Sequence, residues 1–242
     1  MNNYLLPEND GLPSRSSGPW VKEKLFYIKQ YIDTFEIAMR QKSWRKRIYI
    51  DLFAGPGKCQ IKGTQEYLLG SPLLALTTRH PFTDYFFVDS DNEKIDVLCQ
   101  RVGSVSGVKC LVGDANLKVY EIVDTISGID AEFIKGAWSS LNLAFLDPQG
   151  LELEWNTVAT LAKLKKMDLI IHYSQHGIKR LAKNCYDASN ETVVDKFFGG
   201  SQWRDIYARN REKGIHLPLM SPLQKRLDKT CPNCTLLKWR IL

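Results

Sequence analysis

The sequence lacks the apolar segments that carry a protein into or through a membrane. No stretch approaches the run of about 20 apolar residues that a membrane-spanning helix needs. The first twenty residues, MNNYLLPENDGLPSRSSGPW, are polar and have no apolar centre of the kind found in a secretory signal peptide. We therefore expect a soluble, cytoplasmic protein with no membrane partner.

Patterns that bind metals are also missing, so we predict no metal site. The six cysteines are scattered, and only Cys231 and Cys234 form a C-x-x-C pair, with no second pair after it. His172 and His176 stand four residues apart, but no third ligand follows at a recognisable spacing. We read the two thiols as ordinary residues of a turn, and we place His172 near the substrate because it ends an expected strand.

Positive charge is in modest excess, since the formal net charge is +6. This permits an anionic partner such as nucleic acid but does not require one. One basic cluster is KSWRKR at 42–47, and a second set comprises Lys163, Lys165, Lys166, Lys179, Arg180 and Lys183. Both sets are consistent with phosphate contacts and equally with solvated helix faces.

Short apolar strands alternate with amphipathic helices, which predicts an α/β fold. The expected strands are 48–53, 84–89, 108–115, 141–150 and 167–174. The expected helices begin near Trp20 and lie at 71–79, 92–102, 117–127 and 155–166, while 54–70 reads as a long loop. Continuous apolar strands joined by helices indicate a mostly parallel, Rossmann-like sheet with helices on both faces.

This pattern divides the chain into four parts. Residues 1–19 are expected to be a flexible lead-in, and 20–47 a helical segment. Residues 48–174 form the predicted ligand-binding core, and 175–242 a helical extension with a final strand. That strand stops while the pattern is still apolar, which indicates a sequence truncated at Leu242.

One expected strand after another finishes in a carboxylate. These acids are Asp51, Asp89, Asp114 and Asp147. In open α/β sheets, ligands bind beyond the carboxyl ends of the strands. The acids therefore predict a ligand that is neutral or cationic and carries hydroxyl groups.

The turn after the first strand, Gly55-Pro56-Gly57, is not a phosphate-binding turn. The dinucleotide fingerprint G-x-G-x-x-G fails because Gln60 stands at its third glycine. The P-loop pattern fails because Leu52 and Cys59 stand where it needs Gly and Ser or Thr. S-adenosylmethionine (SAM), which has a sulfonium and an amine but no phosphate, fits these observations.

Three motifs resemble those of class I SAM-dependent methyltransferases: DLFAGPG at 51–57, FFVDSD at 86–91 and VGDA at 112–115. DLFAGPG, at 51–57, resembles their motif I, which packs against the methionine part of SAM. The resemblance implies that Asp89 accepts hydrogen bonds from the ribose hydroxyls and that Asp114 contacts the adenine amino group, a role also open to Ala115 or Asn116. Asp51 either orients the loop through backbone N–H groups or contacts the amine of SAM through water.

FLDPQG, at 145–150, is similar to the fourth-strand motif of methyltransferases that act on amino nitrogens. It implies that Asp147 and Pro148 position the acceptor by alignment rather than by acid–base chemistry. Gln149 and Gly150 replace the second proline and the aromatic of the D-P-P-Y type, and Trp155 or Tyr173 would have to supply the ring. Asp147 could instead be a structural loop acid or a helix cap.

A narrower resemblance covers roughly residues 20–175. The combination of KEKLFYIKQYIDTF, YIDLFAGPG, GSPLLAL and FLDPQG looks like the three-Cys-motif partner protein family. That family implies a methyltransferase-like fold and a partner protein of the radical-SAM type with three cysteines. Three hypotheses follow: a SAM-dependent methyltransferase acting on a nitrogen of nucleic acid or a related substrate, a non-catalytic SAM- or nucleoside-binding partner subunit, and a nucleic-acid-binding protein without cofactor.

Overall fold

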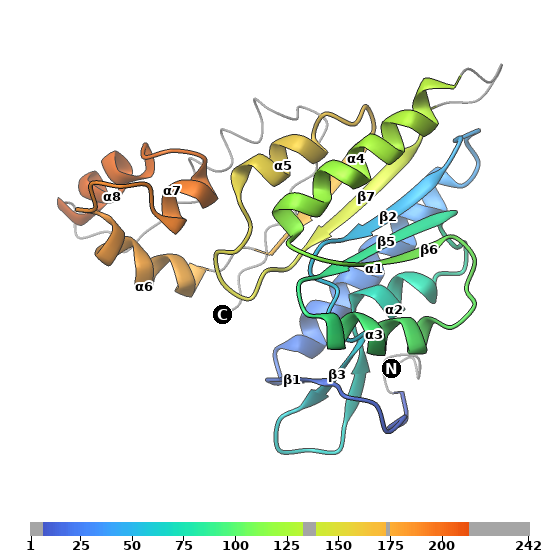
Figure 1. Ribbon diagram of the computed structural model, residues 1–242. Coiled ribbons are helices and arrows are strands. Elements are labelled where there is room, and N and C mark those ends of the chain that lie inside the picture. Colours follow the sequence, from blue (N-terminus) through green and yellow to red (C-terminus); the bar gives the residue numbers. More distant parts are fainter. Residues whose placement is uncertain (1–6, 133–138, 173–174, 213–242) are drawn as a thin grey trace.

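The protein is built on a five-stranded parallel sheet (Figure 1). The computed structural model describes residues 7–132, 139–172 and 175–212. Across the sheet the strands are β6 (Val108–Val112), β5 (Asp84–Asp89), β2 (Arg47–Asp51), β7 (Leu141–Leu146) and β8 (Met167–Ile171). Every neighbouring pair in this sheet is parallel. The order places the first strand of the sheet in its centre, as in Rossmann-like folds, and confirms the predicted α/β class.

Helices cover both faces of this sheet. One face carries α4 (Ala115–Ala131) and α5 (Trp155–Leu161), and the other carries α1 (Val21–Met39), α2 (Ser71–Leu76) and α3 (Asn92–Val102) (Figure 1). Successive strand residues point to opposite faces, so in β2 Ile48 and Ile50 join one apolar cluster and Tyr49 joins the other. Because both faces are buried, the strands read as continuous apolar runs.

The prediction of a long loop at 54–70 is wrong, because this segment contains two strands. β3 (Lys58–Ile61) and β4 (Tyr67–Leu69) form an antiparallel hairpin, and β1 (Arg15–Ser17) pairs in parallel with β3. Cys59, Ile61 and Leu68 are buried against the sheet, and this burial stabilises strands too short to show a clear period. β1 also lies within 1–19, the segment predicted as a flexible lead-in.

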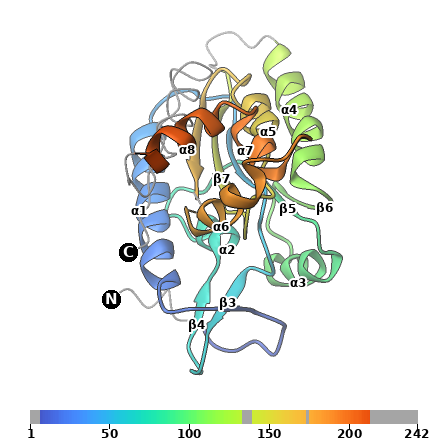
Figure 2. The ribbon, with the colours of Figure 1, turned by 90° about the vertical axis from the view of Figure 1, so that its left-hand side faces the viewer.

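Three further helices lie beyond the carboxyl edge of the large sheet (Figures 1 and 2). They are α6 (Gln175–Cys185), α7 (Val193–Phe198) and α8 (Trp203–Glu212). Val194, Phe197 and Trp203 are buried in the cluster that contains α5. The expected final strand, Cys231, Cys234 and Leu242 lie outside the described residues. Among the helices that are described, none is long and apolar enough to cross a membrane.

A single carboxylate, Asp195, joins α7 to α8. Its backbone N–H and the hydroxyl of Thr192 form a capping box, in which the Asp195 side chain in turn accepts from the Thr192 backbone N–H. Asp195 also accepts from the buried indole Nε1 of Trp203 at 2.9 Å and from Arg204 at 2.7 Å. Asp195 therefore satisfies the start of α7 and the polar atom of a fully buried tryptophan at once.

We predict that Asp195→Ala lowers the free energy of unfolding by roughly 2–4 kcal/mol, because it removes a helix cap and leaves the indole N–H unsatisfied. Asp187, an exposed acid in the turn after α6, provides the matched control. Asp187→Ala should stay within about 0.5 kcal/mol of the parent. Urea unfolding followed by tryptophan fluorescence measures both, and equal values for the two variants would contradict the assignment.

Candidate functional site

A cavity of about 570 Å³ opens at the carboxyl edge of the large sheet. The loops after β2, β5, β6 and β7 line it, together with residues from β1 and the start of α7. Its volume lies within the range of roughly 300–1,000 Å³ that is usual for small-molecule sites. Open α/β sheets bind ligands at this position, which is the topological switch point where the order of the strands across the sheet reverses.

A second, smaller cavity of about 130 Å³ shares part of this lining. Arg15, Phe53, Gly55 and Asp147 line both cavities. Pro56 and Gly57 line only the smaller one, whereas Asp89 and Asp114 line only the larger one. The structure therefore brings six of the eight predicted site residues to two joined cavities.

The two glycines of the turn are required for different reasons. Both have positive φ, +62° at Gly55 and +85° at Gly57. A Cβ at Gly57 would lie 2.8 Å from Leu98 Cδ1, so the turn packs there against α3. A Cβ at Gly55 would meet nothing within 4 Å, so this part of the turn borders open space.

Asp89, at the end of β5, fastens this turn. Its Oδ2 accepts from the Gly55 N–H at 3.0 Å, and its Oδ1 accepts from the Asp91 N–H at 3.0 Å. Lys94 Nζ lies 3.8 Å from Oδ1. The carboxylate thus stands between the glycine turn and the larger cavity.

Asp51 is placed differently from the other acids. It is fully buried, it lines neither cavity, and its Oδ1 accepts from the Phe53 N–H at 3.2 Å. Its Oδ2 makes no hydrogen bond with the described residues. Burial raises the pKa of Asp51 to about 7, although hydrogen bonds from Ser71 and Phe53 oppose this shift. Of the two roles predicted from sequence, this geometry favours orienting the loop.

Asp147, just after β7, is approached by a lysine and a histidine. Lys24 Nζ of α1 lies 2.6 Å from Oδ2, and His172 Nδ1 lies 2.6 Å from Oδ1, but the latter contact is out of line for a hydrogen bond. Although burial acts to raise the pKa of Asp147, Lys24 and His172 hold it well below its usual range. Asp147 is therefore ionised, and it is not a cap because Glu154 occupies the N-cap of α5.

The residues after Asp147 and the aromatic residues expected to stack on the acceptor differ in their exposure. Pro148 is buried and lines neither cavity, while Gln149 is exposed and lines the larger one. Trp155 packs in the core with 4% of its surface exposed, so it is not available to stack on a ligand. Tyr173 and the side chain of His176 lie outside the described residues.

Asp114 serves as the N-cap of α4, where its Oδ1 accepts from the Asn116 N–H at 2.7 Å. Asn116 links the loop after β7 to α4, since its side chain donates to the Glu152 carbonyl and accepts from the Glu154 N–H and the Thr157 hydroxyl. Both side chains line the larger cavity. Both polar atoms of the Asn116 amide are hydrogen-bonded, whereas Asp114 Oδ2 makes no hydrogen bond with the described residues.

Several lining residues escaped the sequence analysis. Arg15 and Lys24 come from the N-terminal part of the chain, Thr192 is the N-cap of α7, and Lys196 lies in that helix. No local motif marks them, because tertiary contacts alone bring them to the cavities. The charged residues lining the larger cavity are the carboxylates Asp89, Asp114, Asp147, Glu152, Glu154 and Glu191 and the cations Arg15, Lys94 and Lys196. Acids therefore outnumber bases by six to three.

Most of the predicted basic residues lie away from the cavities. The cluster at 42–47 precedes β2 and the lysines at 163–166 precede β8, so both stand at the amino edge of the sheet. Arg45, Lys46 and Arg47 form ion pairs with Glu132, Asp84 and Glu36. Lys179, Arg180 and Lys183 belong to α6, beyond the carboxyl edge.

Comparison with models of protein families gives no match for this chain, and comparison with curated protein sequences gives none either.

The raised pKa of Asp51 makes a pH-dependent prediction. Between about pH 4 and 7 this carboxyl is protonated in the folded protein and ionised in the unfolded chain, so the folded state binds more protons and stability falls as pH rises. The change from 3.8 to about 7 corresponds to at most about 4 kcal/mol. The isosteric variant Asp51→Asn lacks this titration.

The measurement is urea unfolding of both proteins at a series of pH values between about 4 and 8. We expect the stability of the parent, relative to Asp51→Asn, to decline across this window and to level off above about pH 7. Free energies that run parallel at all pH values would show that the Asp51 pKa is not raised.

Proposed function

We propose that the protein binds SAM at the carboxyl edge of its sheet and transfers a methyl group to a nitrogen of a nucleic acid or a related substrate. The observation that supports this most is the Asp89 carboxylate, which fastens the Gly55 turn beside a cavity lined by six acids and three bases. When bound, SAM supplies an electrophilic methyl group on a sulfonium. On this proposal the sheet is that of a class I methyltransferase.

The residues present fit the nucleoside part of SAM. Each Asp89 oxygen already accepts one backbone N–H, and a carboxylate oxygen has lone pairs for a further donor such as a ribose hydroxyl. Asp114 keeps one carboxylate oxygen for an adenine amino group. Open space beside Gly55 admits a ligand close to the backbone. Asp51 would support this arrangement from below by holding the loop at Phe53.

The acceptor would approach where the two cavities meet. Asp147 lines both cavities there, and Lys24 keeps its carboxylate ionised and fixed. Pro148 restricts the backbone of the same loop. In our proposal these two residues align the acceptor nitrogen for in-line transfer, which requires orientation more than proton transfer.

A second candidate is a SAM- or nucleoside-binding subunit that does not catalyse transfer and accompanies a three-cysteine protein of the radical-SAM type. The contacts of Asp147 favour it, since Lys24 and His172 approach its two oxygens and leave less capacity for an acceptor. Phe53 is also the one aromatic side chain among the described residues that line the larger cavity. Trp20 lines only the smaller cavity, so the described lining of the larger one offers Phe53 alone as a stacking partner for a flat acceptor.

The four described cysteines are free thiols, which suits the reducing cytoplasm that we propose as the place of action.

We predict that calorimetry detects binding of SAM and of its demethylated product, and that Asp89→Ala lowers both affinities at least about tenfold because charge-assisted hydrogen bonds are lost. Asp96→Ala, which removes an exposed acid of the nearby helix α3, is the control and should bind like the parent. Equal affinities for Asp89→Ala and the parent would show that Asp89 does not hold the ribose.

Methyl transfer is tested by mass spectrometry of RNA, DNA and protein pools incubated with isotopically labelled SAM. We expect label in the nucleic-acid pool with the parent protein and none with Asp147→Ala, whose affinity for SAM should stay within a few fold. Binding of SAM by the parent without transfer to any pool would favour the second candidate. Loss of SAM binding in Asp147→Ala would instead place this residue in the cofactor site.

A further inference from the structure

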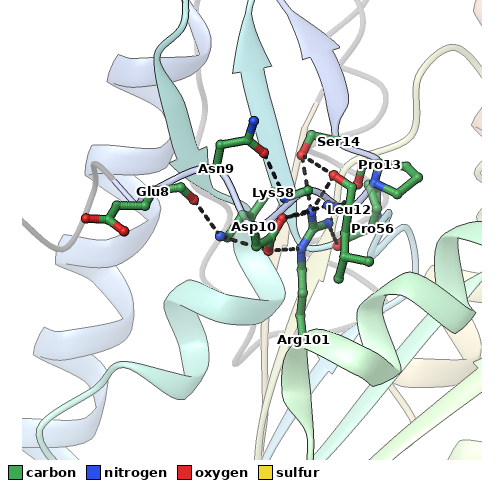
Figure 3. Close-up of polar contacts among 10 residues, drawn as sticks. Glu8, Asn9, Asp10, Leu12, Pro13, Ser14, Pro56, Lys58 and Arg101 are labelled. Carbon is green, nitrogen blue, oxygen red and sulfur yellow. Dashed lines mark hydrogen bonds and ion pairs between the residues drawn. The ribbon is translucent and has the colours of Figure 1, made fainter.

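The N-terminal segment, residues 8–17, is fastened across the glycine turn by one arginine (Figure 3). Arg101 of α3 donates to both carboxylate oxygens of Asp10, with Nε to Oδ2 and Nη2 to Oδ1 at 2.9 Å each. The same guanidinium donates to the carbonyls of Leu12 and Pro13 and to Pro56 of the turn. Its side chain is only 3% exposed.

Lys58 of β3 completes this attachment. Its Nζ lies 2.9 Å from Asp10 Oδ2 and donates to the Glu8 carbonyl at 2.9 Å (Figure 3). The hydrogen bonds from Arg101, together with Lys58, hold the pKa of Asp10 well below its usual range even though burial opposes this. The segment is therefore anchored by a bidentate pair whose guanidinium is buried and whose carboxylate is partly exposed.

This attachment places Arg15 at the boundary between the two cavities. β1 follows the anchored residues directly, and Arg15 pairs in register with Cys59 of β3. Arg15 lines both cavities, and its side chain makes no hydrogen bond or ion pair with the described residues. A guanidinium in this position has its fork of N–H donors available to a ligand.

The two cavities differ in the sign of their charge. The larger one has six acids and three bases, as described above. The charged residues lining the smaller one are the cations Arg15, Lys24, Lys58 and Lys62 and the single acid Asp147. Lys24 is paired with Asp147 and Lys58 with Asp10. Arg15 and Lys62 form no ion pair with the described residues, and of these two only Arg15 lines both cavities.

A ligand that spans both cavities would need a hydroxyl-bearing, neutral or cationic part in the larger one and a small anionic group beside Arg15. We propose that Arg15 binds the carboxylate of the amino-acid part of SAM, and that the N-terminal segment positions it through Asp10 and Arg101. This inference rests on the proposed function. A planar guanidinium matches a carboxylate with two parallel hydrogen bonds, which makes Arg15 a specificity-determining residue for ligands with a free carboxylate.

The test compares SAM with decarboxylated SAM, which keeps the nucleoside, sulfonium and amine and lacks only the carboxylate. Calorimetry on the full chain should show that the parent binds SAM roughly 10- to 100-fold more tightly than the decarboxylated compound. Arg15→Met should bind the two compounds about equally, through loss of affinity for SAM alone. Arg15→Lys should keep part of the preference, because an ammonium lacks the planar fork.

Two further variants test whether the N-terminal segment acts by positioning Arg15 or by stabilising the site as a whole. Asp10→Ala releases the N-terminal segment while keeping Arg15, so it should reduce the preference for SAM and leave affinity for the decarboxylated compound unchanged. Lys196→Met removes a cation that lines only the larger cavity, and it should keep the full preference.

The outcomes distinguish this inference from the function on which it rests. Equal binding of both compounds by the parent, or an unchanged preference in Arg15→Met, overturns the role of Arg15 while the SAM site stands. Equal loss of both compounds in Arg15→Met also overturns it, since the effect would then be structural. Failure of the parent to bind either compound overturns the proposed function together with the inference.

Discussion

The parallel alignment of β2, β5 and β7 is the constraint on which the candidate site depends. Parallel strands finish at the same edge of a sheet, so residues that follow them in separate parts of the chain become neighbours there. This is why Asp89 reaches the Gly55 N–H although 34 residues separate them. Without this alignment the acids would be unrelated loop residues.

Carboxylates repel one another, so gathering four of them at one edge of the sheet is unfavourable. Three of the four are stabilised by contacts of their own. Asp89 accepts two backbone N–H groups, Asp114 caps a helix, and Asp147 is paired with Lys24. Asp51 is the exception, because its Oδ2 has no partner among the described residues and its pKa rises to about 7. The acids thus have different protonation and different freedom to meet a ligand, although all four lie at the carboxyl ends of strands.

The N-terminal segment brings a positive charge to a site that is otherwise lined mainly by acids. It delivers Arg15 to the boundary of a cavity lined mainly by acids, and α1 delivers Lys24 to the adjacent smaller cavity. Both depend on attachments from elsewhere, Arg101 for the segment and Asp147 for Lys24. The site therefore includes elements before the sheet as well as the loops after its strands.

The sequence by itself determined the parallel α/β sheet, because strands buried on both faces must be continuously apolar. It also determined the glycine turn, because glycine adopts the positive φ at Gly55 and Gly57 without the strain that a Cβ brings. It did not reveal β1, β3 and β4, since strands of three or four residues show too little periodicity. Tertiary structure alone decided that Asp51 is buried beneath the loop, that Trp155 lies in the core, and that Arg15 and Lys24 reach the cavities. Burial and long-range pairing depend on which distant segments meet, and no local pattern encodes that.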